Sequence, residues 1–143
     1  MRVVEITKAG APSVLVPTDK PDPTPDKNQV TVDVRAVGVN FADIMGRMGL
    51  YPDAPPIPFV PGYEIAGEAN GKPVVAVTRF NGYADKVIVR KDQIFPLPES
   101  ISFEEAAAIP VNYLTAWVAL QEQARIREGD RVLVEHGAGG VGI

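Results

Sequence analysis

The sequence predicts a mainly β fold, a small closed barrel, with the beginning of an α/β unit after it. The chain has 143 residues, of which 14 are proline and 13 are glycine, and this abundance favours many turns and short strands. Short β-branched or alternating stretches recur up to about residue 98. After Ser102 the composition changes to helix-forming residues. We therefore divide the chain into residues 1–109 and residues 110–143.

The strands are predicted from alternation and from the turn residues between them. Within 29–39, valines and Ala36 alternate with polar residues, which is typical of a strand with one buried face. Asn70 and Gly71 both tolerate positive φ, so they predict a tight type I′ hairpin. The expected strands are Arg2–Thr7, Val14–Val16, Gln29–Val39, Tyr63–Ala69, Lys72–Thr78, Gly82–Val89 and Ile94–Pro98.

Helices are expected at three places. Residues 41–48 carry apolar side chains at i, i+3, i+4 and i+7 (Phe41, Ile44, Met45 and Met48), after Asn40 as N-cap and before Gly49 as stop. Ser102 and Glu105 fit a capping box. Residues 111–125 predict a helix that crosses between the two units, and 131–135 predict a buried parallel strand.

Composition argues against several classes of protein. The net charge of −4 provides no basic patch for nucleic acid. The absence of cysteine removes disulfides and thiolate metal sites. No apolar run approaches the roughly 20 residues that span a bilayer, and the first ten residues lack the apolar core of a signal peptide. We expect no nucleic-acid partner, no membrane span and a cytoplasmic protein.

Four motifs in order carry a resemblance to a known family. They are VGVNFADIMGRMGLY at 37–51, PFVPGYEIAG at 58–67, AAAIPVNYLTAW at 106–117 and VLVEHGAGGVG at 132–142. Together they resemble the medium-chain dehydrogenase/reductase superfamily in its zinc-free quinone oxidoreductase branch, close to the vesicle amine transport protein homologues. The resemblance implies a GroES-like barrel over 1–109, then the start of a Rossmann domain over 110–143.

The same resemblance implies an NADPH-dependent reductase of quinones or other α,β-unsaturated carbonyls, and a homo-oligomer, expected to be a dimer. Because the chain stops within the nucleotide-binding unit, we expect the front part of a longer enzyme, inactive by itself. Two alternatives stay open: a non-catalytic binding module of the same fold, and an enoyl reductase domain of a larger synthase. The expectation that the cofactor is NADPH rather than NADH rests on the resemblance alone.

In the longer protein, cofactor binding is expected at a glycine-rich turn and at three other residues. In the chain as given, the turn is expected to be structural only, because one such turn without its sheet cannot hold a nucleotide. Residues 137–142 match G-x-G-x-x-G after a predicted strand, where glycines let backbone N–H groups approach a pyrophosphate. By resemblance, Asn40 and Tyr51 line the nicotinamide pocket and Thr115 contacts the cofactor. The expected cofactor-binding set is Asn40, Tyr51, Thr115, Gly137, Gly139, Gly140, Val141 and Gly142.

The chain lacks the residues that bind zinc in related proteins, so we expect its chemistry not to use a metal. Zinc members of the family carry cysteine where this chain has Asn40 and histidine where it has Tyr63. The only histidine, His136, follows the last predicted strand. Zinc needs three or four converging thiolate, imidazole or carboxylate ligands, so no metal is expected.

Hydride transfer to an enone needs groups that orient it and stabilise the developing enolate. Tyr51, Tyr63 and Asn40 are the catalytic candidates. A further family tyrosine is Met45 here, which leaves the proton donor open. The structural alternatives are a helix cap for Asn40 and packing for both tyrosines.

Two charged contacts are also expected near these candidates. Asp43 and Arg47 are spaced for a surface ion pair on one helix. Alternatively, Glu64 pairs with Arg47 and fixes the loop.

Overall fold

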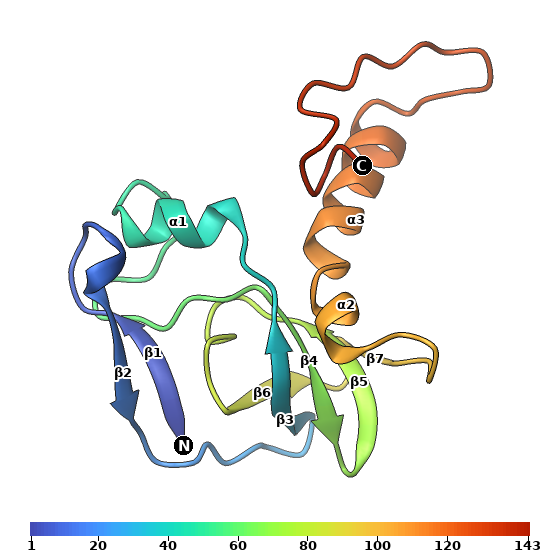
Figure 1. Ribbon diagram of the computed structural model, residues 1–143. Coiled ribbons are helices and arrows are strands. Elements are labelled where there is room, and N and C mark those ends of the chain that lie inside the picture. The colour runs from blue at the N-terminus through green and yellow to red at the C-terminus, as the bar shows by residue number, and fades with distance from the viewer.

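The computed structural model describes all residues from 1 to 143, and strands dominate its first hundred residues (Figure 1). The strands are β1 (Arg2–Ile6), β2 (Leu15–Asp19), β3 (Gln29–Val37), β4 (Glu64–Ala69), β5 (Lys72–Val77), β6 (Lys86–Arg90) and β7 (Ile94–Pro96). The helical elements are η1 (Pro12–Val14), α1 (Phe41–Arg47), α2 (Phe103–Ala107), α3 (Pro110–Trp117) and η2 (Val118–Gln123). The predicted mainly β class is confirmed.

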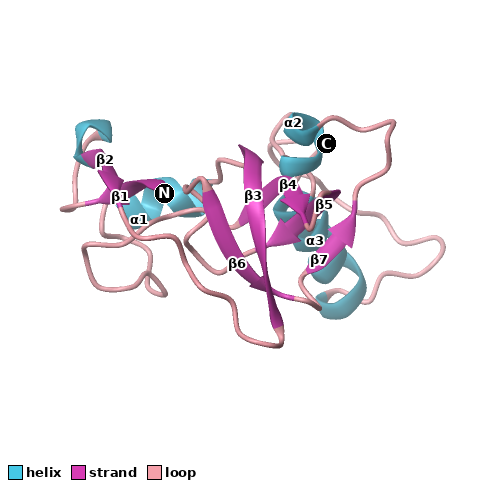
Figure 2. Cartoon of the chain, turned by 90° about the horizontal axis from the view of Figure 1, so that it is seen from below, coloured by secondary structure: helices cyan, strands magenta, loops and turns pink.

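The strands form two sheets. β1 and β2 make an antiparallel pair, and the other five strands are antiparallel neighbours in the order β6-β3-β4-β5-β7. The larger sheet curls into a half-barrel, seen from below in Figure 2. The isolated bridges Val3–Ala84 and Ile6–Phe59 connect the β1–β2 pair to the rest. The predicted barrel architecture is thus confirmed in this curled form, with the two sheets joined only by isolated bridges.

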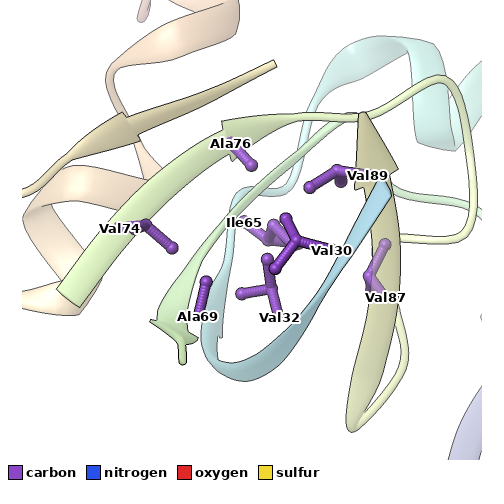
Figure 3. Close-up of a cluster of buried hydrophobic side chains, with 8 residues drawn as sticks. All are labelled: Val30, Val32, Ile65, Ala69, Val74, Ala76, Val87 and Val89. Atoms are coloured by element: carbon purple, nitrogen blue, oxygen red, sulfur yellow. The ribbon is translucent and has the colours of Figure 1, made fainter. Parts of the chain in front are cut away.

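The main core lies inside the curl of the five-stranded sheet (Figure 3). The alternation predicted for β3 is confirmed, since Val30 and Val32 are buried while Asp33 and Arg35 are exposed. The cluster comprises Val30, Val32, Ile65, Ala69, Val74, Ala76, Val87 and Val89. All are aliphatic side chains contributed by four neighbouring strands.

Helix α2 covers the opposite face of the same sheet. Ala106 and Ala107 pack with Ala66 of β4 in a separate cluster. Because side chains alternate along a strand, Ile65 points into the half-barrel while Ala66 and Glu64 share the face toward α2. This alternation places the Glu64 carboxyl beside the beginning of α3.

The hairpin between β4 and β5 confirms the sequence prediction. Ala69 pairs with Lys72, which leaves Asn70 and Gly71 as a two-residue loop. Their φ angles are 51° and 72°, as a type I′ turn requires. The turn is therefore short and fixes the register of the two strands.

Helix α1 buries the opposite side from the one that the sequence predicted. Phe41 is 73% exposed and Met48 45% exposed, whereas Asp43 and Gly46 are buried. A Cβ added at Gly46 would lie 3.3 Å from the Phe59 ring, so glycine permits a close approach to the loop. The prediction that the apolar side chains of this helix face the core is wrong, because the hydrogen bonds to Asp43, rather than apolar burial, set the orientation of the helix.

The C-terminal segment diverges from its prediction after α3. The capping box is confirmed, since Ser102 and Glu105 exchange backbone-to-side-chain hydrogen bonds. The crossing helix runs through α3 into the π-helical turns of η2. Residues 131–135, however, form no strand, and Leu133 is 88% exposed. A strand needs a neighbour for its backbone N–H and C=O groups, and no strand lies beside this segment (Figure 1). None of the helices has the length and apolar character needed to cross a bilayer.

Candidate functional site

The candidate site lies where β3 ends, α1 begins and β4 starts, and Asp43 organises it. Asp43 is 6% exposed. Its Oδ2 accepts a hydrogen bond from the Asn40 backbone N–H at 2.9 Å, and its Oδ1 accepts one from the Gly62 N–H at 2.9 Å. The carboxylate thereby ties the first turn of α1 to the loop that leads into Tyr63.

Burial raises the pKa of the Asp43 carboxyl, and the N–H groups of Asn40 and Gly62 oppose that rise. Tyr83 lies near the same carboxyl, and burial together with the charge of Asp43 raises the pKa of its phenol. Sequence reasoning missed Tyr83, because it placed this residue in the expected strand Gly82–Val89, 40 residues from Asp43; in the structure β6 begins only at Lys86, and Tyr83 precedes it. The surface ion pair predicted between Asp43 and Arg47 is wrong: Asp43 points inward, and Arg47 Nη1 donates to the Gly10 carbonyl at 2.7 Å.

Glu64 connects the site to the crossing helix. Its side chain is 1% exposed, and its Oε1 accepts from Asn40 Nδ2 at 2.8 Å. Its Oε2 accepts from the Val111 backbone N–H at 2.8 Å, in the first turn of α3. The alternative pairing of Glu64 with Arg47 is therefore wrong. Sequence reasoning missed the contact with Val111 because the two residues are 47 positions apart and one partner is a backbone amide.

The two candidate tyrosines lie edge to face. The ring centroids of Tyr51 and Tyr63 are 6.1 Å apart with planes at 75°, and Tyr63 also packs on Phe80 at 5.0 Å. The Tyr63 hydroxyl is buried without a hydrogen-bond partner. Burial raises the pKa of Tyr63, and the neighbouring Tyr51 adds to the rise, so the phenol stays neutral at ordinary pH. Both tyrosines pack against the cluster of Ile6, Val14, Phe59 and Phe80.

The structure therefore brings Asn40, Tyr51 and Tyr63 into one neighbourhood. Asn40 and Tyr63 are linked through Asp43 and Gly62, and Tyr51 contacts Tyr63. This neighbourhood includes all three residues proposed as catalytic from the sequence. Asn40 is also the N-cap residue of α1, so the cap position and the site coincide.

The cofactor-binding candidates on the C-terminal side lie apart from this neighbourhood. Thr115 is exposed on α3. The glycine-rich turn (Gly137, Gly139, Gly140, Val141 and Gly142) is held by local hydrogen bonds such as Gly139 N–H to the His136 carbonyl at 2.8 Å. Gly140 sits directly against the Asn112 side chain, where a Cβ would lie 2.6 Å from Asn112 Oδ1. The turn thus contacts α3.

The donor set for a metal ion is limited. No group of three or more His, Cys, Asp or Glu side chains is arranged to hold one. The two buried carboxylates, Asp43 and Glu64, direct their oxygens at N–H donors instead.

Comparison with known proteins identifies the family. The model of the alcohol dehydrogenase GroES-like domain matches residues 26–81. The synaptic vesicle membrane protein VAT-1 homolog of Rattus norvegicus is 44% identical over 85% of this chain and 33% of its own length. The quinone oxidoreductase of Mus musculus is 37% identical over 100% of this chain and 47% of its own.

A solved structure gives the same result. The quinone oxidoreductase of Thermus thermophilus, which was also solved as a complex with NADPH, superposes with a TM-score of 0.91 at 40% identity. The match covers 99% of this chain and 46% of that one. The chain thus spans half or less of the length of these relatives. With its GroES-like domain, it belongs to the medium-chain dehydrogenase/reductase superfamily, alongside the quinone oxidoreductases and the VAT-1 homologues.

Proposed function

We propose that this chain is part of an NADPH-dependent oxidoreductase that reduces quinones or other α,β-unsaturated carbonyls by hydride transfer without a metal. The observation that carries the proposal is the Glu64 link. One carboxylate holds both Asn40, at the beginning of α1, and the first turn of α3, the helix that bears Thr115. Candidate cofactor contacts from two separate segments are thereby fixed relative to each other.

The residues of the half-barrel fit the nicotinamide end of such a cofactor. An amide oxygen and a phenol are groups that meet a carboxamide or a ribose hydroxyl by hydrogen bonding. The glycine-rich turn has the composition for a pyrophosphate, but residues 131–135 before it are unpaired, so a cradle would need further strands beside them. Isolated residues 1–143 are accordingly proposed to have no turnover.

When bound, NADPH supplies the hydride. In the proposed scheme Asn40 orients the nicotinamide, and Tyr51 donates a hydrogen bond to the carbonyl oxygen where negative charge develops. Tyr63 is the least accessible of the three catalytic candidates because its hydroxyl is buried. Its proposed part is to hold the Tyr51 ring through the edge-to-face contact.

The test uses the protein that carries this chain, with NADPH and 1,4-naphthoquinone, and follows the loss of nicotinamide absorbance. We expect Tyr51→Phe to lower kcat/KM by about tenfold or more, because a hydrogen bond to a charged oxygen is lost. Tyr113→Phe is the matched control: Tyr113 is 65% exposed on α3, and its loss should change kcat/KM less than about twofold. Absence of NADPH binding, or equal effects of the two substitutions, would overturn the proposal.

A further inference from the structure

The Glu64 carboxylate is buried in a space that Gly38 leaves open, and both of its oxygens accept hydrogen bonds. It is 1% exposed, and it enters a space that exists because residue 38 has no side chain. A Cβ at Gly38 would collide with Glu64 Oε1 and with the Ala107 carbonyl oxygen. Both carboxylate oxygens are used, one by Asn40 Nδ2 and the other by the Val111 N–H, each at 2.8 Å.

This arrangement decides which way the Asn40 side chain faces. A primary amide has a donating side and an accepting side, whereas a carboxylate only accepts. Asn40 must therefore turn Nδ2 toward Glu64, and its Oδ1 faces the other way, on the side of the Asp43 backbone N–H in the first turn of α1. The Asn40 backbone is fixed as well, because its N–H donates to Asp43. The half-buried amide consequently has a single orientation.

We propose that Glu64 is a positioning residue that sets the hydrogen-bonding polarity of the site. Through it, Asn40 keeps a carbonyl oxygen on the side away from Glu64; one lone pair of that oxygen serves the capping box of α1, and the ligand group that the second lone pair recognises is an N–H or O–H donor. The carboxamide nitrogen and the ribose hydroxyls of a nicotinamide nucleotide belong to this class. This assignment of ligand rests on the proposed function; the orientation of the amide does not. The same carboxylate fixes the beginning of α3, so the two effects are coupled.

The substitution Glu64→Gln separates these two effects. The introduced glutamine has one accepting oxygen, which the Val111 N–H can keep, and an amide nitrogen that then faces Asn40. Two facing donors repel, so Asn40 must rotate and turn its Oδ1 toward the introduced amide. The site would then present a donor in place of an acceptor. Asn40→Asp alone would instead place two carboxylates face to face.

Exchanging the two functional groups should restore the arrangement. In the double variant Asn40→Asp/Glu64→Gln, the introduced aspartate accepts from the amide nitrogen of the introduced glutamine, whose oxygen accepts from the Val111 N–H. Every hydrogen bond of the original set is replaced, and the site again presents an acceptor oxygen. A rescue of this kind is expected only if the two side chains act as a pair.

Hydrogen exchange followed by NMR on the 143-residue chain tests the orientation without any cofactor. We expect the Asn40 side-chain amide protons to exchange at least about tenfold more slowly than those of the exposed Asn70. In Glu64→Gln that protection should disappear while protection of the Val111 amide stays within about threefold. In Asn40→Asp protection of Val111 should fall by about tenfold or more, and the double variant should recover it.

Two results of this experiment would overturn the positioning role. One is rapid exchange of the Asn40 amide protons in the unaltered chain. The other is a double variant that protects Val111 no better than Asn40→Asp alone.

The ligand polarity is tested by NADPH titration of the protein that carries this chain. Glu64→Gln should weaken NADPH binding by about tenfold, and the double variant should recover most of it. Unchanged affinity in Glu64→Gln would refute the polarity. If no variant binds NADPH, the proposed function and the ligand assignment both fall, while the exchange data still decide the orientation of Asn40.

Discussion

Replacing Asp43 by alanine is the most direct test of how the site is held together. Asp43 is a buried carboxylate that binds the N–H groups of Asn40 and Gly62 at 2.9 Å each. Asp43→Ala leaves both N–H groups without this partner and separates α1 from the loop before Tyr63. The substitution removes no apolar contact of consequence, so hydrogen bonding dominates its effect.

The size of the effect follows from the two bonds. A hydrogen bond to a charged group contributes about 1.5–3 kcal/mol, so the pair contributes about 3–6 kcal/mol. The cost of burying the charge, visible in the raised pKa of Asp43, offsets part of this. We expect a net loss of about 3 kcal/mol in the free energy of unfolding, or about 6–12 °C in Tm for a chain of this size.

Urea unfolding at neutral pH, followed by far-UV circular dichroism, measures this loss. Asp53→Ala is the control, since Asp53 is exposed on the neighbouring loop, and its effect should stay within about 0.5 kcal/mol. If Asp43→Ala costs less than about 1 kcal/mol, the argument that Asp43 orients α1 is refuted.

Three further predictions concern the same framework. Burial raises the pKa of Asp43 above its ordinary value of 3.8, so the part of its contribution to stability that comes from protonation is fully present below that value and is lost as pH rises through the folded-state pKa, while the hydrogen bonds from Asn40 and Gly62 remain at neutral pH. The destabilisation by Asp43→Asn should therefore shrink from pH about 4 to pH about 7 in urea unfolding, and growth of the difference would contradict the burial argument. Gly38→Ala should destabilise by about 2 kcal/mol or more through collision with Glu64 and Ala107, and an unchanged Tm would show that the space is larger than described. Gly71→Ala should cost about 1 kcal/mol through its positive φ alone, since a Cβ there meets no atom within 4 Å, and a cost below about 0.3 kcal/mol in urea unfolding would argue against the left-handed turn.

Local patterns in the sequence predicted those parts of the fold that depend on neighbouring residues. The alternation in β3 indicated its buried face, because one residue in two must contact the core. Asn70 and Gly71 indicated the hairpin, because few residue pairs tolerate two positive φ angles. Ser102 and Glu105 indicated the beginning of α2 for an equally local reason.

The errors arose where a distant partner decides the outcome. On α1, the apolar spacing predicted the buried face, and the i, i+4 spacing of Asp43 and Arg47 predicted an ion pair. Instead, the Asp43 carboxylate accepts a hydrogen bond from the Gly62 N–H and lies in the interior. Residues 131–135 have strand-forming composition, but pairing depends on a neighbour. The family resemblance pointed to Asn40 and Tyr51, and Tyr63 was a candidate because it is a neutral hydrogen-bond donor in the same stretch. The contact of Glu64 with the Val111 N–H, by contrast, has no signature in sequence.

The unpaired segment after η2 also determines how the chain meets a protease. Arg125, Arg127 and Arg131 lie in exposed backbone outside any helix or strand, while most of the lysines and arginines of the half-barrel sit on or beside paired strands. Trypsin requires an extended, accessible stretch of backbone, so it should cut first at these three arginines. Mild digestion would thus remove the last residues. It would leave the curled sheet, α1 and the hydrogen bonds of Glu64 with Asn40 and Val111 in one resistant product, whose mass can be measured by mass spectrometry.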